Sequence, residues 1–282
     1  MFPGGPKSVE NLRTPAFDLD SVHGGGPVAR PDLYDAADGA KFRVESGGRF
    51  EDLPRTADNR AVIADPRNDE NLMISGLHAA FLKFHNNAVD LARSQGVSDL
   101  MEAFTEARRL TTWHYQWMVL HEFLPLFVGQ ALVDEVVTGG RSFFTPTAGF
   151  IPIEFQGAAY RFGHSMVRPS YPANLTGDNG GPFIAFVFDP SQVGKDDPDD
   201  MSGGKRAPRR FIDWGSFFDF GTGTAGNNKR IDTKLSTPLF NLPHATISTP
   251  AGGRSAPRRW PSGTSCATSP GPCRRASAWP SA

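Results

Sequence analysis

The most informative stretch of this sequence is residues 155–167, which read FQGAAYRFGHSMV. Its composition predicts a short helix, and it carries a single histidine, His164, directly after Gly163. An arginine, Arg161, lies three residues before that histidine. The combination suits a buried haem, because glycine lets the backbone approach a flat macrocycle, imidazole ligates iron and guanidinium pairs with a propionate. A lone histidine on an apolar helix is also a common core residue, so other segments have to decide between the two interpretations.

Helical periodicity elsewhere predicts a mainly α fold with long irregular loops and little β structure. We expect helices at residues 69–95, 98–121, 129–137 and 153–167. Asp69 and Glu70 favour the start of the first helix through its dipole, and Gly96 suits its end. The core stripe predicted for the second helix is Leu100, Phe104, Ala107, Leu110, Trp117 and Leu120.

The Gly-, Pro- and Asp-rich residues 1–60 are expected to form loops, and so are residues 170–243. An acidic patch at 196–200 and a basic patch at 205–210 lie in the second of these ranges. Charged runs of this kind are most simply solvated surface, so we expect both patches to face water.

Composition bounds the class of protein. A chain of 282 residues with 39% hydrophobic residues can bury a substantial core, and its net charge of −1 gives no sign of a nucleic-acid partner. No run is long enough for a transmembrane helix. The first residues lack the pattern of a secretory signal, so we expect a cytoplasmic chain as written, or a secreted one if the true N-terminus lies upstream. Cys266 and Cys273 lie in the last 20 residues, which argues against a disulfide-built core or a zinc site.

The stretch from Ala245 to Ala282 differs from the rest of the chain. It holds five arginines and no lysine, aspartate or glutamate, and beyond Ile247 it has no Leu, Val, Ile or Phe. The near-neutral total charge therefore depends on this tail, since 24 basic residues (29 less these five) and 30 acidic ones remain without it. A segment of this composition cannot contribute a core, so we expect one domain over residues 1–243 and an aberrant, disordered tail over 244–282.

Polar residues surround the start of the first predicted helix. Residues 64–72 read ADPRNDENL, with Arg67 ahead of the helix and Glu70 one turn further on. Taken alone, this is ordinarily a capping and surface arrangement.

Two histidine pairs, His78/His85 and His114/His121, are each spaced seven residues apart, so the members of a pair share a helix face. Metal-binding pairs on one helix are more often three or four residues apart. We therefore expect these four to be buried structural histidines.

Taken together, five segments resemble the animal-type haem peroxidase superfamily, in the form that also occurs in bacteria. They are RTPAFDLDSVHGGGP (13–27), ADPRNDENLMISGLHAAFLKFHNNAV (64–89), RRLTTWHYQWMVLHEFLP (108–125), IPIEFQGAAYRFGHSMVRP (151–169) and RIDTKLSTPLFNLP (230–243). Their collinear order over most of residues 10–243 is far more specific than any single motif. The resemblance implies a partial haem peroxidase domain that uses haem b and oxidises a small reducing substrate with hydrogen peroxide.

The resemblance also implies roles for individual residues. His164 corresponds to the proximal iron ligand, and Arg161 to an arginine that pairs with a haem propionate. Arg67 corresponds to the distal arginine that polarises the peroxide O–O bond, a preorganised charge that favours heterolytic cleavage. Glu70 corresponds to an acid at the haem edge that forms an ester to the haem in some members. Fatty-acid dioxygenases of the superfamily need a tyrosine where Arg161 stands, and Tyr160 is displaced by one, which favours a peroxidase.

The loop at residues 14–20 corresponds to the family's calcium loop. Its candidate ligands are the Thr14 hydroxyl and carbonyl, the Ala16 carbonyl, the Asp18 carboxylate and Asp20 in place of a common serine. Oxygen atoms at alternating positions suit a hard cation. Without the resemblance, the same residues would be interpreted only as a turn-rich acidic loop.

Two departures from the family pattern concern activity. Nothing before Thr14 resembles the segment that carries the distal histidine, the general acid–base of peroxide cleavage, or the neighbouring aspartate that ligates calcium. After residue 243 we find no helix with the asparagine that orients the proximal histidine. Because residues 259–282, back-translated and read in another frame, resemble the expected continuation, we hypothesise a frameshift between Pro243 and Arg259. A non-catalytic or weakly haem-binding remnant is therefore the main alternative, and a fatty-acid dioxygenase is less favoured.

Overall fold

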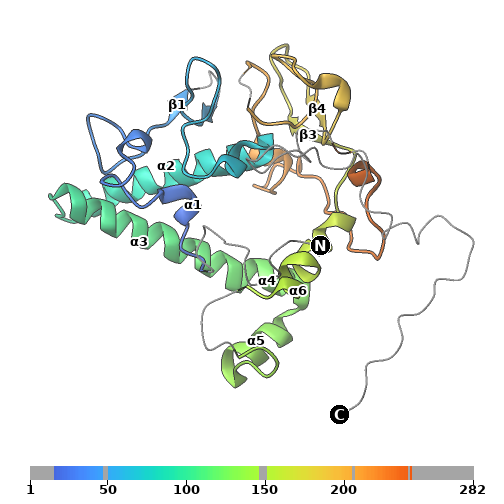
Figure 1. Ribbon diagram of the computed structural model, residues 1–282, viewed down its shortest axis with the longest axis horizontal. Helices are drawn as coiled ribbons and strands as arrows, with labels where there is room; N and C mark the ends of the chain where they lie inside the picture. Colours follow the sequence, from blue (N-terminus) through green and yellow to red (C-terminus); the bar gives the residue numbers. More distant parts are fainter. Residues whose placement is uncertain (1–15, 47–49, 146–150, 205–206, 241, 243–282) are drawn as a thin grey trace, which may run out of the picture.

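The computed structural model describes residues 16–46, 50–145, 151–204, 207–240 and 242, and these are mainly helical, as predicted (Figure 1). The α-helices are α1 (Asp20–His23), α2 (Leu72–Ser94), α3 (Leu100–Met118), α4 (Leu124–Val128), α5 (Gln130–Gly139) and α6 (Ile153–Gly157). The strands are β1 (Glu45–Ser46), β2 (Glu51–Asp52), β3 (Ser170–Asn174) and β4 (Phe183–Phe186). Short 3-10 turns occupy Pro31–Leu33, Pro66–Asp69, Ala159–Ser165, Pro190–Gln192, Trp214–Ser216 and Thr237–Phe240. The predicted tail, residues 244–282, lies outside the described residues.

Helices α2 and α3 form an antiparallel hairpin, and the two helices make the most extensive contact between elements of the fold (Figure 1). Asn71 caps α2, since its side chain accepts a hydrogen bond from the Met73 amide, so the helix begins two to three residues later than Asp69 and Glu70 suggested. Asp99 caps α3 in the same way. Gly96 ends the first helix as expected, and its φ of 99° is a conformation that favours glycine.

The main core lies where α2 and α3 meet the chain between residues 19 and 64. Its buried side chains include Leu33, Phe42, Leu53, Leu82, Val89 and Phe104. Small residues such as Ala79, Ala103 and Ala107 allow the two helices to approach each other closely.

Only part of the predicted stripe of α3 is buried. Phe104 and Ala107 lie in the core, whereas Leu100, Trp117 and Leu120 are 40% to 53% exposed. Trp117 and Leu120 lie near and beyond the C-terminal end of α3, past the segment that covers Phe104 and Ala107, whereas Leu100 is the first residue of the helix. The prediction of a continuous core stripe was therefore wrong.

The two histidine pairs have different outcomes. His78 and His85 are buried on α2, as predicted. His114 and His121 are exposed, so the same prediction was wrong for them. The cause is again the uncovered second half of the α3 segment.

After α3 the chain continues through a π-helical turn, Val119–Phe123, into α4 and then α5 (Figure 1). The predicted helix at 153–167 is not continuous. It is broken at Ala158, with φ −131° and ψ −68°, into α6 and a 3-10 turn that contains His164. The aromatic rings of Phe127 on α4 and Phe162 in this turn lie 4.9 Å apart, which joins the turn to the helical part of the fold.

Residues 170–243 are not only loops, which corrects the prediction. Strands β3 and β4 pair as an antiparallel hairpin, with a register irregularity between Pro172 and Asn174. The hairpin is part of a second core whose buried members are Leu72, Ala173, Phe183, Ala185, Met201 and Ile212.

The two charged patches pack against each other, so the prediction that both are solvated surface holds only in part: Asp196, Asp197 and Asp199 are exposed, whereas Asp200 and Arg210 are buried. Arg209 forms ion pairs with Asp197 and Asp199. The guanidinium of Arg210 is buried and donates to the carbonyls of Pro198, Asp200 and Ser202. Residues 205 and 206 of the basic patch lie outside the described residues.

Across the described ranges, no helix combines the length and apolar character that crossing a bilayer requires.

Candidate functional site

Arg67 lies in the 3-10 turn Pro66–Asp69, which together with Asp65 and Glu70 is called the Arg67 turn below. The buried carboxylate of Asp65 caps it, accepting from the Arg67 amide at 3.0 Å. The same carboxylate accepts from the Arg67 guanidinium at 3.0 Å (Nε) and 2.7 Å (Nη2). These hydrogen bonds raise the pKa of Arg67 above its ordinary value, although its side chain is 65% exposed. The Arg67 turn therefore presents a permanent, solvent-facing cation.

A buried arginine, Arg55, holds the Arg67 turn on its inner side. The Arg55 side chain is only 3% exposed and forms two hydrogen bonds to the Asp69 carboxylate, at 2.7 and 2.8 Å, and a further one to Asp52 at 3.1 Å. Burial opposes this charge, but the hydrogen bonds that Arg55 donates to Asp69 and Asp52 outweigh the cost of burial and raise the pKa of Arg55. Arg55 is thus a clamp between the Arg67 turn and the chain near β2.

The other side of the Arg67 turn meets the segment after β4. The Gly203 amide donates to the Glu70 carbonyl at 3.0 Å, and the Leu72 amide to the Met201 carbonyl at 2.7 Å. A side chain at position 203 would collide with the Asp69 carbonyl, so this approach requires glycine. Glu70 itself is exposed.

The structure brings Glu70 and Asp20 within electrostatic reach of Arg67. The link to α1 is direct, since the Asn68 side-chain amide donates to the Ser21 carbonyl at 3.0 Å. Two of the segments predicted to contribute to the site, near residues 14–20 and 64–72, therefore lie side by side.

The calcium loop stays a prediction. Thr14 lies outside the described residues. The Asp18 carboxylate accepts from the Asp20 amide at 3.1 Å, and Leu19 between them has a φ of 56°. Ala16 is exposed at the start of this turn. Within the described ranges, no group of three or more His, Cys, Asp or Glu residues is arranged to hold a metal ion.

His164 lies in the 3-10 turn Ala159–Ser165, called the His164 turn below, and is half-buried. No described residue forms a hydrogen bond with its imidazole. The carbonyl of the next residue, Ser165, is held by the Lys229 ammonium at 2.5 Å and the Ser236 hydroxyl at 2.8 Å. The Ser236 amide also donates to the His164 carbonyl at 3.1 Å. The backbone of the turn is therefore fixed while the ring nitrogens stay available.

The surroundings of His164 fit a haem ligand. A Cβ atom added to Gly163, the residue before His164, would meet nothing within 4 Å, so there is open space at this point of the turn. Burial lowers the pKa of His164, and the charge of Arg161 lowers it further, which keeps the ring in the neutral form that binds iron. Arg161 is exposed, and its Nε donates to the Gln156 carbonyl at 3.1 Å. Its other donor atoms can therefore meet an anion such as a propionate.

Tyr115 on α3 packs beside the predicted calcium loop, with its ring 5.9 Å from that of Phe17. Burial raises the pKa of Tyr115, and the nearby phenol of Tyr160 in the His164 turn raises it further. No sequence pattern marks Tyr115 for this position.

The residues that support the two turns were not predicted from the sequence: Asp65, Arg55, Lys229 and Ser236. Only Asp65 had a local signal, because an aspartate directly before a proline is a typical helix-start pair.

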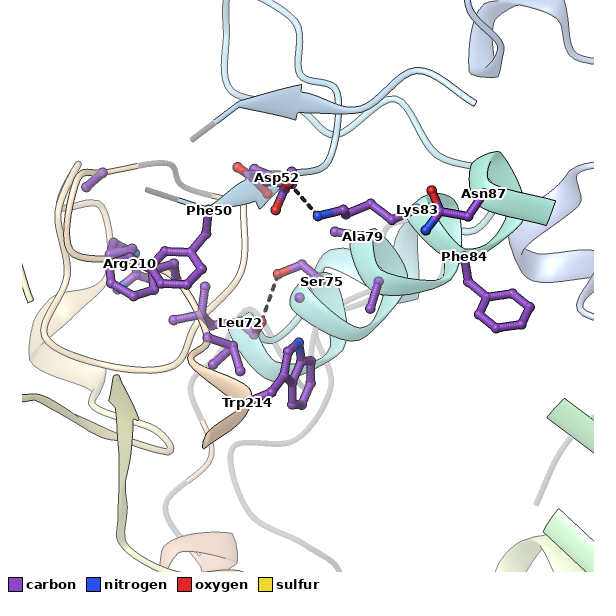
Figure 2. Close-up of a pocket in the computed structure, with 16 residues that line it drawn as sticks. Phe50, Asp52, Leu72, Ser75, Ala79, Lys83, Phe84, Asn87, Arg210 and Trp214 are labelled. Carbon is purple, nitrogen blue, oxygen red and sulfur yellow. Dashed lines mark hydrogen bonds and ion pairs between the residues drawn. The ribbon is translucent and has the colours of Figure 1, made fainter. Parts of the chain in front are cut away.

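A separate cavity of about 360 Å³ lies between the N-terminal half of α2, the chain near β2 and residues 207–214 (Figure 2). Figure 2 shows Phe50 and Arg210 toward one end and Phe84 and Asn87 toward the other. Neither the Arg67 turn nor the His164 turn contributes a residue to its lining. The cavity is therefore distinct from the candidate site.

Comparison with known proteins identifies the family. Residues 3–197, more than half of the chain, match the family described as animal haem peroxidase. The chain therefore belongs to the animal haem peroxidase family.

Among its relatives are named peroxidases from animals. Peroxidase skpo-1 of Caenorhabditis elegans is 28% identical over 166 residues, which cover 57% of this chain and 24% of that protein. Chorion peroxidase of Aedes aegypti is 32% identical over 145 residues, which cover 46% of this chain and 18% of that protein. The chain thus spans a quarter or less of the length of these relatives. A solved structure, peroxidase A from Dictyostelium discoideum, aligns with a TM-score of 0.46 and 19% identity, over 67% of this chain and 36% of that one.

Proposed function

We propose that this chain is part of a haem peroxidase that oxidises small reducing substrates with hydrogen peroxide. The observation that carries the proposal is the family match over residues 3–197 together with the half-buried imidazole of His164, which no described residue engages. A bound haem supplies the iron-centred redox chemistry that reduces peroxide and withdraws electrons from a reductant.

In this proposal the chain's own residues have four roles. His164 would ligate the iron through a neutral imidazole, which its lowered pKa favours. Arg161 would pair with a propionate, and Glu70 would lie at the haem edge. Arg67 would place a permanent positive charge next to bound peroxide, where a preorganised cation favours separation of charge in the O–O bond.

A haem-binding chain without turnover is the second candidate. The Arg67 guanidinium is already engaged by the buried carboxylate of Asp65, which offsets part of the charge that peroxide cleavage needs. A fatty-acid dioxygenase is less favoured, because Arg161 stands where that activity needs a tyrosine.

The test is a titration of the purified chain with haemin, followed by the Soret band and then by oxidation of guaiacol with hydrogen peroxide. We expect a saturable Soret shift that His164→Ala weakens by at least about tenfold in affinity. The matched control is His114→Ala, which removes an exposed histidine of α3 and should leave the titration unchanged.

The outcomes separate the candidates. No Soret shift in the unmodified chain, or equal shifts with and without the His164 imidazole, would contradict the proposed haem site. A shift that depends on His164 but brings no guaiacol oxidation would support the haem-binding chain without turnover.

A further inference from the structure

Three histidines are buried together where residues 19–42 pack against α2. Residues 19–42 are called the N-terminal layer below. His23 at the end of α1 and His85 on α2 are each 0% exposed, and His78 on α2 is 4% exposed. The rings of His23 and His85 lie 5.3 Å apart. None of the three has a role in the proposed peroxidase chemistry.

The hydrogen bonds of His23 and His85 fix which ring nitrogen carries a proton, and burial favours the neutral form of both rings. His23 Nδ1 lies 3.1 Å from the Leu19 carbonyl, and His85 Nε2 lies 3.0 Å from the Ala40 carbonyl. A carbonyl only accepts, so each of these nitrogens carries the proton. The remaining nitrogens, His23 Nε2 and His85 Nδ1, then carry bare lone pairs, and both are buried with no hydrogen-bond partner among the described residues. A proton added to either nitrogen would create a buried positive charge and an N–H group without a hydrogen-bond acceptor.

His78 joins the N-terminal layer to α2 through one side chain. Its Nδ1 lies 2.8 Å from the Asn68 side-chain amide, which also donates to the Ser21 carbonyl. A proton on Nδ1 would replace this acceptor by a donor and break the link.

The charged and titratable groups around the cluster give little compensation for added protons. Arg108 on α3 opposes a positive charge on both His23 and His85. His85 and His78 also oppose a positive charge on His23. Tyr34 donates its hydroxyl to the His23 carbonyl. Among the charged groups of the described residues, Asp65 near His78 favours a proton on that ring.

We propose that His23, His78 and His85 form an acid-sensitive latch that keeps the N-terminal layer on α2 at neutral pH and releases it on mild acidification. In the released layer water reaches all three rings, so each binds a proton that the latched state cannot accommodate. Release therefore takes up as many as three protons.

The direction of the pH dependence follows from the ring environments. Burial lowers the pKa of His23 to about 3, and it lowers those of His78 and His85 to about 4. The ordinary value of 6.5 applies once the rings are in water. The latch is thus complete above pH 6.5 and weakens as the pH falls from 6.5 toward 4.

The experiment is native-state hydrogen exchange of the full chain at pH 7, 6 and 5, corrected for intrinsic exchange rates. The reporter is the Phe42 amide, which donates to the Asn86 side chain of α2 at 2.8 Å, with the amides of β3 and β4 as reference. We expect the opening constant at Phe42 to rise by up to about 1,000-fold per pH unit, tenfold for each histidine, while β3 and β4 change much less.

Variants of single histidines show which residue takes up each proton on release of the latch. His23→Gln and His85→Gln keep a donor for the carbonyl but cannot titrate, so each should reduce the slope by about one proton. His114→Gln, on the exposed face of α3, should leave it unchanged. The latch is overturned if Phe42 protection in the unmodified chain is independent of pH, or falls in step with β3 and β4. It is also overturned if the two folded variants retain the full slope, and the unmodified series alone decides if neither variant folds.

Discussion

The Arg67 turn and the His164 turn are both short 3-10 segments beside a helix, but they are held in different ways. Buried charges fix the first one, through Arg55 below it and Asp65 at its cap. The second is more exposed, and backbone carbonyls fix it, with Lys229 and Ser236 as their donors. Removing a buried charge partner costs more free energy than removing one hydroxyl. Substitutions at the Arg67 turn should therefore act mainly on folding, and those at the His164 turn mainly on binding.

The largest effect is expected from Arg55→Ala. It leaves the carboxylate of Asp69, which is largely buried, without its cation, and breaking a buried pair in this way costs about 3–5 kcal/mol in the free energy of unfolding. Urea unfolding followed by circular dichroism measures the loss. The control is Arg93→Ala, whose pair with Asp38 is partly exposed, so that its loss should cost less than about 1 kcal/mol. Equal losses in the two variants would show that the Arg67 turn is not held by its buried charges.

The helical hairpin could be predicted from the sequence because its determinants are local. Apolar spacing identified α2 and α3, and the caps Asn71 and Asp99 lie directly before the residues that they cap. The wrong predictions of burial on the α3 segment have a common cause. Whether Trp117 is covered depends on a distant segment packing over it, and spacing along one helix carries no information about that segment.

The candidate site divides in the same way. The order of motifs selects Arg67 and His164 as candidate residues, since each stands in its own recognisable segment, and their roles stay predictions. Their supports could not be predicted, because Arg55 and Asp69 are 14 residues apart and Ser165 and Lys229 are 64 apart. Such pairs are set by the tertiary fold, which a local pattern does not specify.

A smaller effect is expected from Ser236→Ala at the His164 turn. The substitution removes the buried hydroxyl that donates to the Ser165 carbonyl, while Lys229 still holds that carbonyl, so about 1 kcal/mol of stability should be lost. Haemin affinity should fall as well, because the backbone beside His164 is less fixed. Ser94→Ala, which removes an exposed hydroxyl bonded to the Leu91 carbonyl, is the control and should change neither quantity. A loss of 3 kcal/mol or more, matching Arg55→Ala, would remove the distinction between the two turns.

The smallest effect concerns the charges alone and compares Arg161→Gln with Arg67→Gln. The pKa of His164 is lowered by burial and by Arg161, so removing Arg161 raises it toward 6.5. Protons compete with iron for the imidazole below its pKa, where affinity falls up to tenfold per pH unit. The acid limb of haemin binding should therefore move to higher pH in Arg161→Gln, whereas Arg67→Gln should leave it in place because Arg67 is not among the charges that affect His164. Soret titrations between pH 5 and 8 measure both limbs. A loss of affinity in Arg161→Gln that is uniform across this range would limit Arg161 to pairing with the propionate and exclude its effect on the imidazole.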